Sequence, residues 1–135
     1  MTIYEEQVRT FYSEIWNEKN FDQISNVLHD DFSFRGSLGQ EKRGNEEFIE
    51  YVNYIHSALS NYKCIIEDLV VQSEKVFAKM CFTGKHDSEF LGFEATGNQV
   101  SWAGAALFIF SGKKVTNLWV LGDMKSLETQ LGNKT

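Results

Sequence analysis

The sequence has no proline, only two cysteines and no strongly basic segment among its 135 residues. Cys64 and Cys81 lie in predicted strands without the spacing of metal ligands, so we expect reduced core residues, with a disulfide between them as the alternative. The net charge of −6 disfavours nucleic acid and anionic membranes as partners, because binding to phosphates requires a basic surface. The expected partners are neutral small molecules or other protein surfaces.

Long apolar runs and an apolar leader are also missing. The longest apolar run, residues 103–110, has the length of a strand and falls well short of the roughly 20 residues that cross a bilayer. The N-terminus becomes acidic at Glu5 and Glu6 and has no signal-peptide pattern. We therefore expect a cytoplasmic protein that does not span a membrane.

Large aromatic side chains are abundant instead, with 11 Phe, 5 Tyr and 3 Trp. The hydrophobic fraction of 42% and the charged fraction of 24% are those of an ordinary globular protein, which excludes a disordered, collagen-like or low-complexity chain. The length suits one domain, which we place over residues 1–135. Its interior should be lined by aromatic rings and could include a hydrophobic pocket.

Apolar periodicity predicts helices first and strands later. Thr2 and Glu5 have the spacing of a capping box, which predicts a first helix with an apolar stripe that ends at Trp16. A short second helix follows around 24–28, and a third begins near Asn45. Alternation predicts strands at 32–35, 62–71, 76–86, 99–110 and 115–123. A short terminal helix is expected at 126–131.

Helices followed by strands with short connections are typical of the α+β class. The turns at 73–74 and 111–113 are too short for crossover helices, so the sheet should be mainly antiparallel. We expect this sheet to curve around the N-terminal helices as a cone, with a pocket at its open end.

Asp123 is the first candidate for a catalytic residue. Strict alternation along 115–123 places it on the same strand face as Trp119 and Leu121. If that face lines the cone, burial would raise the pKa of the carboxyl and make it a general acid or base. The alternative is that Asp123, at a strand end, only caps the following helix through Ser126.

His86 is the second candidate. It ends the strand 76–86 on the face of Met80 and Phe82, where it could donate a hydrogen bond or shuttle a proton. The alternative is a strand-end histidine whose ring is satisfied by backbone or solvent. The candidates for substrate binding are aromatic residues, which at strand period are also common in an ordinary core: Trp16, Phe34, Phe90, Trp102 and Trp119.

Motifs for cofactors and metals are missing. The sequence has no Walker-type loop, no G-x-G-x-x-G, no G-x-S-x-G and no Cys or His cluster with metal-ligand spacing. We therefore expect neither a cofactor nor a metal. Any chemistry would depend on proton transfer, electrostatics and confinement.

Two segments resemble a known family. Residues 83–97 resemble the pattern G-x-H-x-G-x-F-x-G-x-x-x-T-G, and residues 119–132 resemble W-x-x-x-D-x-x-x-L-x-x-Q-L-G. Both patterns are marks of the SnoaL-like polyketide cyclases, a family of the nuclear transport factor 2-like superfamily. The sequence departs from the family at Ser88, where glycine is usual, at Ala95, where proline is common, and at Asn117, where glutamate is usual.

The resemblance implies a cone-shaped α+β barrel without a cofactor, often dimeric through the outer sheet face. It also implies that Asp123 removes an acidic proton between two carbonyls, so that the carbanion closes a ring by aldol attack. The leading hypothesis is a cofactor-free enzyme that acts on a small hydrophobic or aromatic molecule, with Asp123 as acid/base and His86 in support. The alternatives are a non-catalytic ligand-binding protein and an isomerase or hydrolase on the same fold.

A homodimer is expected from the residues themselves as well. One face of the strand 99–110 is apolar although it should point away from the helices, at Ala103, Ala105, Leu107 and Ile109.

Overall fold

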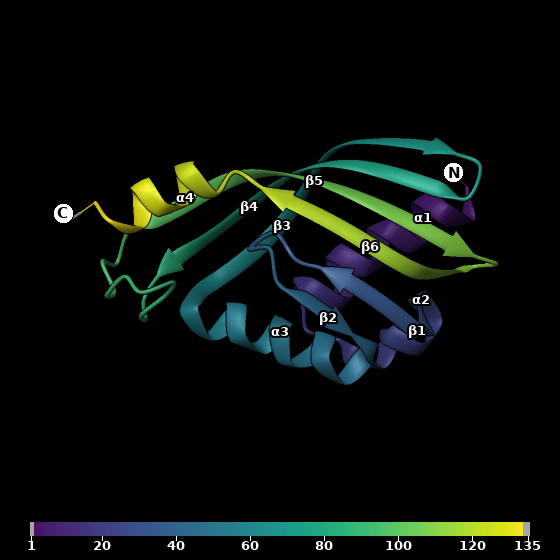
Figure 1. Ribbon diagram of the computed structural model, residues 1–135, viewed down its shortest axis with the longest axis horizontal. Helices are drawn as coiled ribbons and strands as arrows, with labels where there is room; N and C mark the ends of the chain where they lie inside the picture. The colour runs from purple at the N-terminus through teal and green to yellow at the C-terminus, as the bar shows by residue number, and fades with distance from the viewer. Residues whose placement is uncertain (1, 134–135) are drawn as a thin grey trace.

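The computed structural model describes residues 2–133, which form one curved sheet with the N-terminal and middle helices on its concave side and the C-terminal helix at one end (Figure 1). The helical segments are α1 (Ile3–Thr10), the π-helical η1 (Phe11–Trp16), the 3-10 turn η2 (Phe21–Gln23), α2 (Ile24–Val27), α3 (Gly44–Ala58) and α4 (Met124–Leu131). The strands are β1 (Leu28–Arg35), β2 (Glu41–Arg43), β3 (Leu59–Gln72), β4 (Lys75–His86), β5 (Gln99–Ser111) and β6 (Lys114–Gly122).

The strand order is β2-β1-β6-β5-β4-β3, with β1 and β6 parallel and every other neighbouring pair antiparallel. This confirms the α+β class and the mainly antiparallel, curved sheet. The expected barrel is wrong, because the edge strands β2 and β3 do not pair with each other. Helix α3 contacts β2, β1 and β3, so it occupies the gap that strand pairing would otherwise close (Figure 1).

The first helix begins as predicted and then widens. The Thr2 hydroxyl accepts a hydrogen bond from the Glu5 amide at 3.1 Å, which caps α1. In η1 the backbone hydrogen bonds join residues five apart instead of four, and the Asn17 amide donates to the Tyr12 carbonyl at 2.9 Å. Such π-helical turns are rare and frequently occur at functional sites.

The short strand β2 was not among the predicted strands. Its residues Glu41, Lys42 and Arg43 are all charged, so no apolar alternation marks it. It pairs only with β1, at the sheet edge.

Strand β6 presents the opposite face to the one expected. Its register with β5 shifts between Ile109, which pairs with Asn117, and Phe110, which pairs with Val115. Val115 is buried as expected, but after this shift the even-numbered residues of β6 face the core instead of the odd-numbered ones. Leu118 and Val120 point to the core, whereas Trp119 and Leu121 are 44% and 48% exposed on the outer face. A one-residue slip moves every following side chain to the other face of a sheet, which strict alternation cannot foresee.

Strand β3 is a long edge strand that is twice interrupted. Its pairing with β4 shifts between Ser60 and Lys63 and again between Ile66 and Asp68. Asn61, in the first irregularity, has a positive φ of 54°. Exposed charges flank these positions, including Lys63 and Asp68.

The two cysteines are free, and they lie on opposite faces of the sheet. Cys64 is buried in the core, whereas Cys81 lies between the inward-facing Met80 and Phe82 and is partly exposed. Cys64 is a core residue as expected, but Cys81 is not. Across residues 2–133, no helix combines the length and the apolar character that crossing a membrane requires.

Candidate functional site

The interior of the cone contains a small cavity with a mainly aromatic lining. Its volume is about 10 Å³, which is room for roughly one water molecule. The lining residues come from η1, β1 and the loop after it, α3, β3, β4 and β6: Phe11, Tyr12, Trp16, Phe34, Ser37, Tyr51, Ile55, Tyr62, Cys64, Phe82, Leu118 and Val120. None of these side chains is an acid or a base of the Asp, Glu, Lys, Arg or His type, so the cavity is uncharged.

Segment η1 supplies one wall of the cavity through Phe11, Tyr12 and Trp16. The Trp16 ring makes an edge contact with the Tyr51 ring of α3, with 5.9 Å between the ring centroids. The Tyr62 ring of β3 lies 5.6 Å from the Trp16 ring. Edge and tilted contacts of this kind are favourable for aromatic pairs, so the rings fill the space that a ligand would need.

Three buried polar atoms beside this cavity have no hydrogen-bond partner in good geometry among residues 2–133. They are the hydroxyls of Tyr12 and Tyr51 and the indole N–H of Trp102. Each of these residues is only 3% exposed. Leaving such a group unpaired in the interior is costly, and buried polar groups are normally satisfied.

Two glycines make room for two of these groups. A Cβ on Gly36 would lie 2.5 Å from the Tyr51 hydroxyl, and a Cβ on Gly122 would lie 3.1 Å from the Trp102 Nε1. The same position on Gly122 is 3.0 Å from the carbonyl oxygen of Ser37. The Tyr51 hydroxyl and the Trp102 indole therefore both lie beside the segment 36–37, at the end of the cavity where Ser37 contributes to the lining.

The remaining polar groups of the cavity are kept neutral. The Cys64 thiol donates to the Tyr62 hydroxyl, with 3.7 Å between sulfur and oxygen. Burial raises the pKa of both groups, and it also raises the pKa of Tyr12. Burial raises the pKa of Tyr51 to about 12, although the nearby Leu38 backbone and Ser37 side chain oppose part of that shift. All four groups are protonated at neutral pH, and the Cys64 thiol already donates to Tyr62.

Asp123 does not contribute to the cavity. Because of the slip in β6, its side chain is exposed, and Oδ1 accepts a hydrogen bond from the Ser126 amide at 3.2 Å. Its own amide donates to the Ala103 carbonyl at 2.9 Å. This is the geometry of the capping alternative, and the expectation that Asp123 shares an inner wall with Trp119 and Leu121 is wrong.

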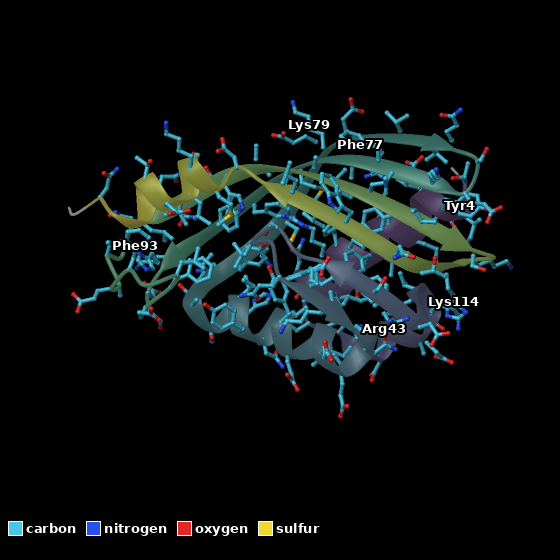
Figure 2. The ribbon with its side chains drawn as sticks, in the orientation of Figure 1. Tyr4, Arg43, Phe77, Lys79, Phe93 and Lys114 are labelled. Atoms are coloured by element: carbon cyan, nitrogen blue, oxygen red, sulfur yellow. The ribbon has the colours of Figure 1, made fainter. Side chains whose placement is uncertain are left out.

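His86 is buried at the end of β4 and holds the loop 87–98. Its Nε2 lies 3.2 Å from the Phe93 carbonyl, which can only accept, so this nitrogen carries the proton. In the neutral ring, Nδ1 then accepts from the Thr96 hydroxyl at 3.0 Å. Both ring nitrogens are thus occupied by the loop, as the structural alternative predicts; Figure 2 shows Phe93 at the end of the molecule beside α4.

The five aromatic candidates lie in different places. Trp16 and Phe34 line the cavity, and Trp102 lies behind it, with its ring 5.5 Å from the Phe82 ring. Phe90 is buried under the α3 residue Tyr54, outside the cavity. Trp119 lies on the outer face, where the Arg35 guanidinium is 5.8 Å from the ring centroid.

Tyr12, Tyr51, Tyr62 and Cys64 were not singled out as binding residues, although their positions had a signal. Tyr12 belongs to the predicted apolar stripe of the first helix, and Tyr51 lies one turn from Phe48 on the buried side of α3. Tyr62 and Cys64 alternate on the inner face of β3. Periodicity identifies these residues as core, but it carries no information about whether a buried hydroxyl finds a partner.

His56 is a further titratable group next to the cavity. Its Nε2 donates to the Trp16 carbonyl at 2.7 Å, and its ring stacks on the Trp16 ring at 6.5 Å. Partial burial lowers the pKa of His56, the Trp16 carbonyl opposes this shift, and the charges of Lys19 and Lys63 add to it. Elsewhere, residues 2–133 contain no cluster of three or more His, Cys, Asp or Glu side chains suited to a metal ion.

Comparison with known sequences identifies the family. The sequence profile described as SnoaL-like polyketide cyclase matches residues 6–131. The chain belongs to this family. No curated protein sequence matches the chain.

Several solved structures share the fold over almost the whole chain. A protein of Jannaschia sp. CCS1 assigned to the SnoaL-like polyketide cyclases superposes with a TM-score of 0.88 at 19% identity, over 98% of this chain and 94% of that one. TsrD of Streptomyces laurentii gives 0.85 at 23% identity, over 96% and 95%. A SnoaL-like polyketide cyclase of Agrobacterium tumefaciens gives 0.81 at 19% identity, over 98% and 100%. At these identities the likeness shows the fold alone.

Proposed function

We propose that this SnoaL-like protein binds a small, uncharged aromatic molecule inside the cone and does so without catalysis. The observation that supports the proposal is the uncharged aromatic lining of the cavity, which contains no carboxylate or imidazole. Such a lining favours a flat apolar ligand and disfavours a charged one, because burying an unpaired charge is very costly. It also provides no acid/base pair for proton transfer in the interior.

Binding requires the cavity to widen, since its volume of about 10 Å³ is far below the 300–1,000 Å³ of typical ligand pockets. Tyr51 is the residue we expect to move. Its ring also lines a surface hollow of about 260 Å³ together with Gln40, Lys42, Glu50 and Tyr54. A rotation of the Tyr51 ring would therefore connect the cavity with the surface.

The proposal is tested with indane, a small apolar aromatic probe, in an NMR titration of the protein. We expect saturable chemical-shift changes and intermolecular NOEs at the cavity residues Phe34 and Leu118. The variant Val120→Phe fills the cavity and should weaken binding at least about tenfold, because the added ring competes for the same space. Its matched control is Leu121→Phe, which enlarges the neighbouring residue on the outer face.

Two results would contradict the proposal. The first is the absence of NOEs to the cavity residues up to the solubility limit of indane. The second is an equal loss of binding in Val120→Phe and Leu121→Phe, since a specific interior site requires the two faces of β6 to respond differently.

Polyketide cyclisation with Asp123 as the acid/base is the second candidate function. The observation in its favour is that Asp123 falls on the aspartate of the Trp-x-x-x-Asp ending that resembles the family pattern. On a substrate that the protein converts, Asp123→Asn should keep the fold and abolish turnover, because asparagine still caps α4 but cannot accept the proton. Turnover that survives in Asp123→Asn would exclude this role.

We also propose that the protein is a homodimer that pairs through the outer face of the sheet. Register places Val70 opposite Phe77, Phe77 opposite Leu107 and Leu107 opposite Trp119, so these four side chains form an apolar row across β3, β4, β5 and β6. Val70, Phe77 and Trp119 are 58%, 43% and 44% exposed. Figure 2 shows Phe77 projecting away from the helices, on the side where a second copy could lie.

A further inference from the structure

We propose a second binding site on the outer face of the sheet, which holds a zwitterionic amino acid with an apolar side chain. The site is a hollow of about 480 Å³ over β2, β1, β6 and β5, which lie side by side in the sheet (Figure 1). This volume is within the range of roughly 300–1,000 Å³ that is typical of ligand sites. The hollow lies on the face opposite to the cone, so the inference does not depend on the function proposed for the interior cavity.

The strand register gives the hollow an apolar floor. Trp119 of β6 pairs with Leu107 of β5, and Asn117 pairs with Ile109. All four residues line the hollow, and Trp119 is 44% exposed. An aromatic or aliphatic side chain of a ligand can therefore cover apolar surface that otherwise faces water.

Arg35 is the cation of the site, and its guanidinium is held in place. Register puts Arg35 beside Trp119, and the guanidinium carbon lies 5.8 Å from the centroid of the Trp119 ring. Nη1 donates to the carbonyls of Val120 and Gly36. Within the described part of the chain the guanidinium makes no other hydrogen bond, so Nε and Nη2 can bind a carboxylate.

Glu41 is the anion of the site. It is exposed and lies directly opposite Arg35 in the pairing of β2 with β1. Side chains in such positions have Cβ atoms about 5 Å apart. The ion pairs found among residues 2–133 nevertheless involve neither of the two. Because the guanidinium lies over Trp119 and bonds to β6, the carboxylate of Glu41 is left available for an ammonium group.

A free α-amino acid matches this pair of charges. Its ammonium and carboxylate groups are attached to one carbon, so it can place one charge against Glu41 and the other against Arg35 at the same time. Arg43 and Glu47 also line the hollow and add one further charge of each sign. A ligand with a single charge would leave one sign of the hollow unpaired, which favours the zwitterion.

Trp119 and Leu107 also belong to the apolar row of the proposed dimer, so a ligand on this floor would compete with a second copy of the chain. Phe77 belongs to the row but does not line the hollow. The measurements are therefore made on Phe77→Asp as well as on the unsubstituted protein, because the new charge disfavours association and leaves the hollow intact.

The test is an NMR titration that compares L-phenylalanine with two derivatives. N-acetyl-L-phenylalanine lacks the positive charge, and L-phenylalaninamide lacks the negative charge. We expect L-phenylalanine to bind at least about fivefold more tightly than either derivative, because only it pairs with both signs. NOEs from its phenyl ring should reach the methyl groups of Ile109, which lines the hollow, and not those of Val120, which lines the interior cavity.

Two variants assign the charges. Arg35→Gln should weaken the binding of L-phenylalanine and N-acetyl-L-phenylalanine about threefold to tenfold and leave L-phenylalaninamide unchanged. Glu41→Gln should weaken L-phenylalanine and L-phenylalaninamide by a similar factor and leave N-acetyl-L-phenylalanine unchanged. Since Glu41 is an exposed residue at the sheet edge, this variant tests the site even if Arg35→Gln fails to fold. The controls are Arg9→Gln and Glu6→Gln, which remove exposed charges of the same types from α1.

Four results would overturn the inference. The first is the absence of binding to both the unsubstituted protein and Phe77→Asp at millimolar L-phenylalanine. The second is an equal affinity for all three compounds. The third is a loss of binding in the control variants as large as that in Arg35→Gln and Glu41→Gln. The fourth is a set of NOEs to Val120 in place of Ile109, which would put the ligand inside the cone and agree with the function proposed there.

Discussion

Asp123 has a structural task that can be measured independently of any activity. Its carboxylate caps α4 through the Ser126 amide. We predict that Asp123→Ala lowers the free energy of unfolding by about 1 kcal/mol, because the cap is lost, whereas Asp123→Asn changes it by only a few tenths. Urea denaturation of the two variants checks this. Equal losses in both variants would mean that the charge of Asp123, rather than its hydrogen bond, stabilises the helix.

His56 should make the stability of the protein depend on pH. Because burial lowers its pKa from the usual value of 6.5, the folded state favours the neutral ring. Its stabilising contribution is therefore complete above pH 6.5 and is lost as the pH falls through the lowered folded-state pKa.

We predict that His56→Gln reduces the decrease in the free energy of unfolding between about pH 7.5 and about pH 5.5. Urea denaturation at a series of pH values measures that decrease. His29→Gln is the matched control, since His29 lies on β1 and its Nδ1 accepts a hydrogen bond from the Asp31 amide. An unchanged pH profile in His56→Gln would assign the dependence to other groups.

At the scale of elements, the sequence predicts most of the fold because periodicity reports burial. The helices near 3–16, 24–27 and 44–58 and the long strands follow it, and so do the inner faces of β4 and β5. Apolar periodicity does not predict two features of the sheet. The charged β2 has no apolar alternation, and the slip in β6 depends on its pairing with β5, which no local pattern encodes.

That slip also explains why the candidate site was only partly predictable. Trp16 and Phe34 line the cavity as expected of aromatic residues near the cone. Trp119 and Asp123 lie on the opposite face from the one predicted, because the register shift precedes them in the chain. The unpaired hydroxyls of Tyr12 and Tyr51 depend on contacts between distant elements. Residue type alone could not have identified them.

The assignment of faces along β6 leads to a prediction with an internal control. Val120→Ala should lower the free energy of unfolding by about 2 kcal/mol, because it removes buried methyl groups and leaves a void. Leu121→Ala, one residue further along on the outer face, should change it by less than about 0.5 kcal/mol in the monomer. Denaturation of both variants checks the prediction, and the reverse order of the two effects would contradict the observed register.

At the scale of the whole molecule, the apolar row on the outer face predicts the association state. We expect light scattering to give the mass of a dimer at micromolar concentration. Trp119→Asp should shift the protein to the monomer, because it places a charge at the β6 end of the apolar row. Asn53→Asp, on the exposed side of α3, adds the same charge away from the sheet and should leave the dimer intact.

A monomeric mass for the unsubstituted protein would remove the dimer proposal. An unchanged dimer in Trp119→Asp would move the interface to another surface.

The open sheet also has a consequence for aggregation. An unpaired edge strand such as β3 is a template onto which another chain could add, and a barrel would have removed that risk. In β3 the two register shifts divide the edge into short pieces, and the charges of Lys63 and Asp68 lie beside them. An approaching strand therefore finds no long uninterrupted run of free amides and carbonyls. The interrupted edge of β3 therefore disfavours edge-to-edge association of copies of this chain into fibres, although the sheet is open.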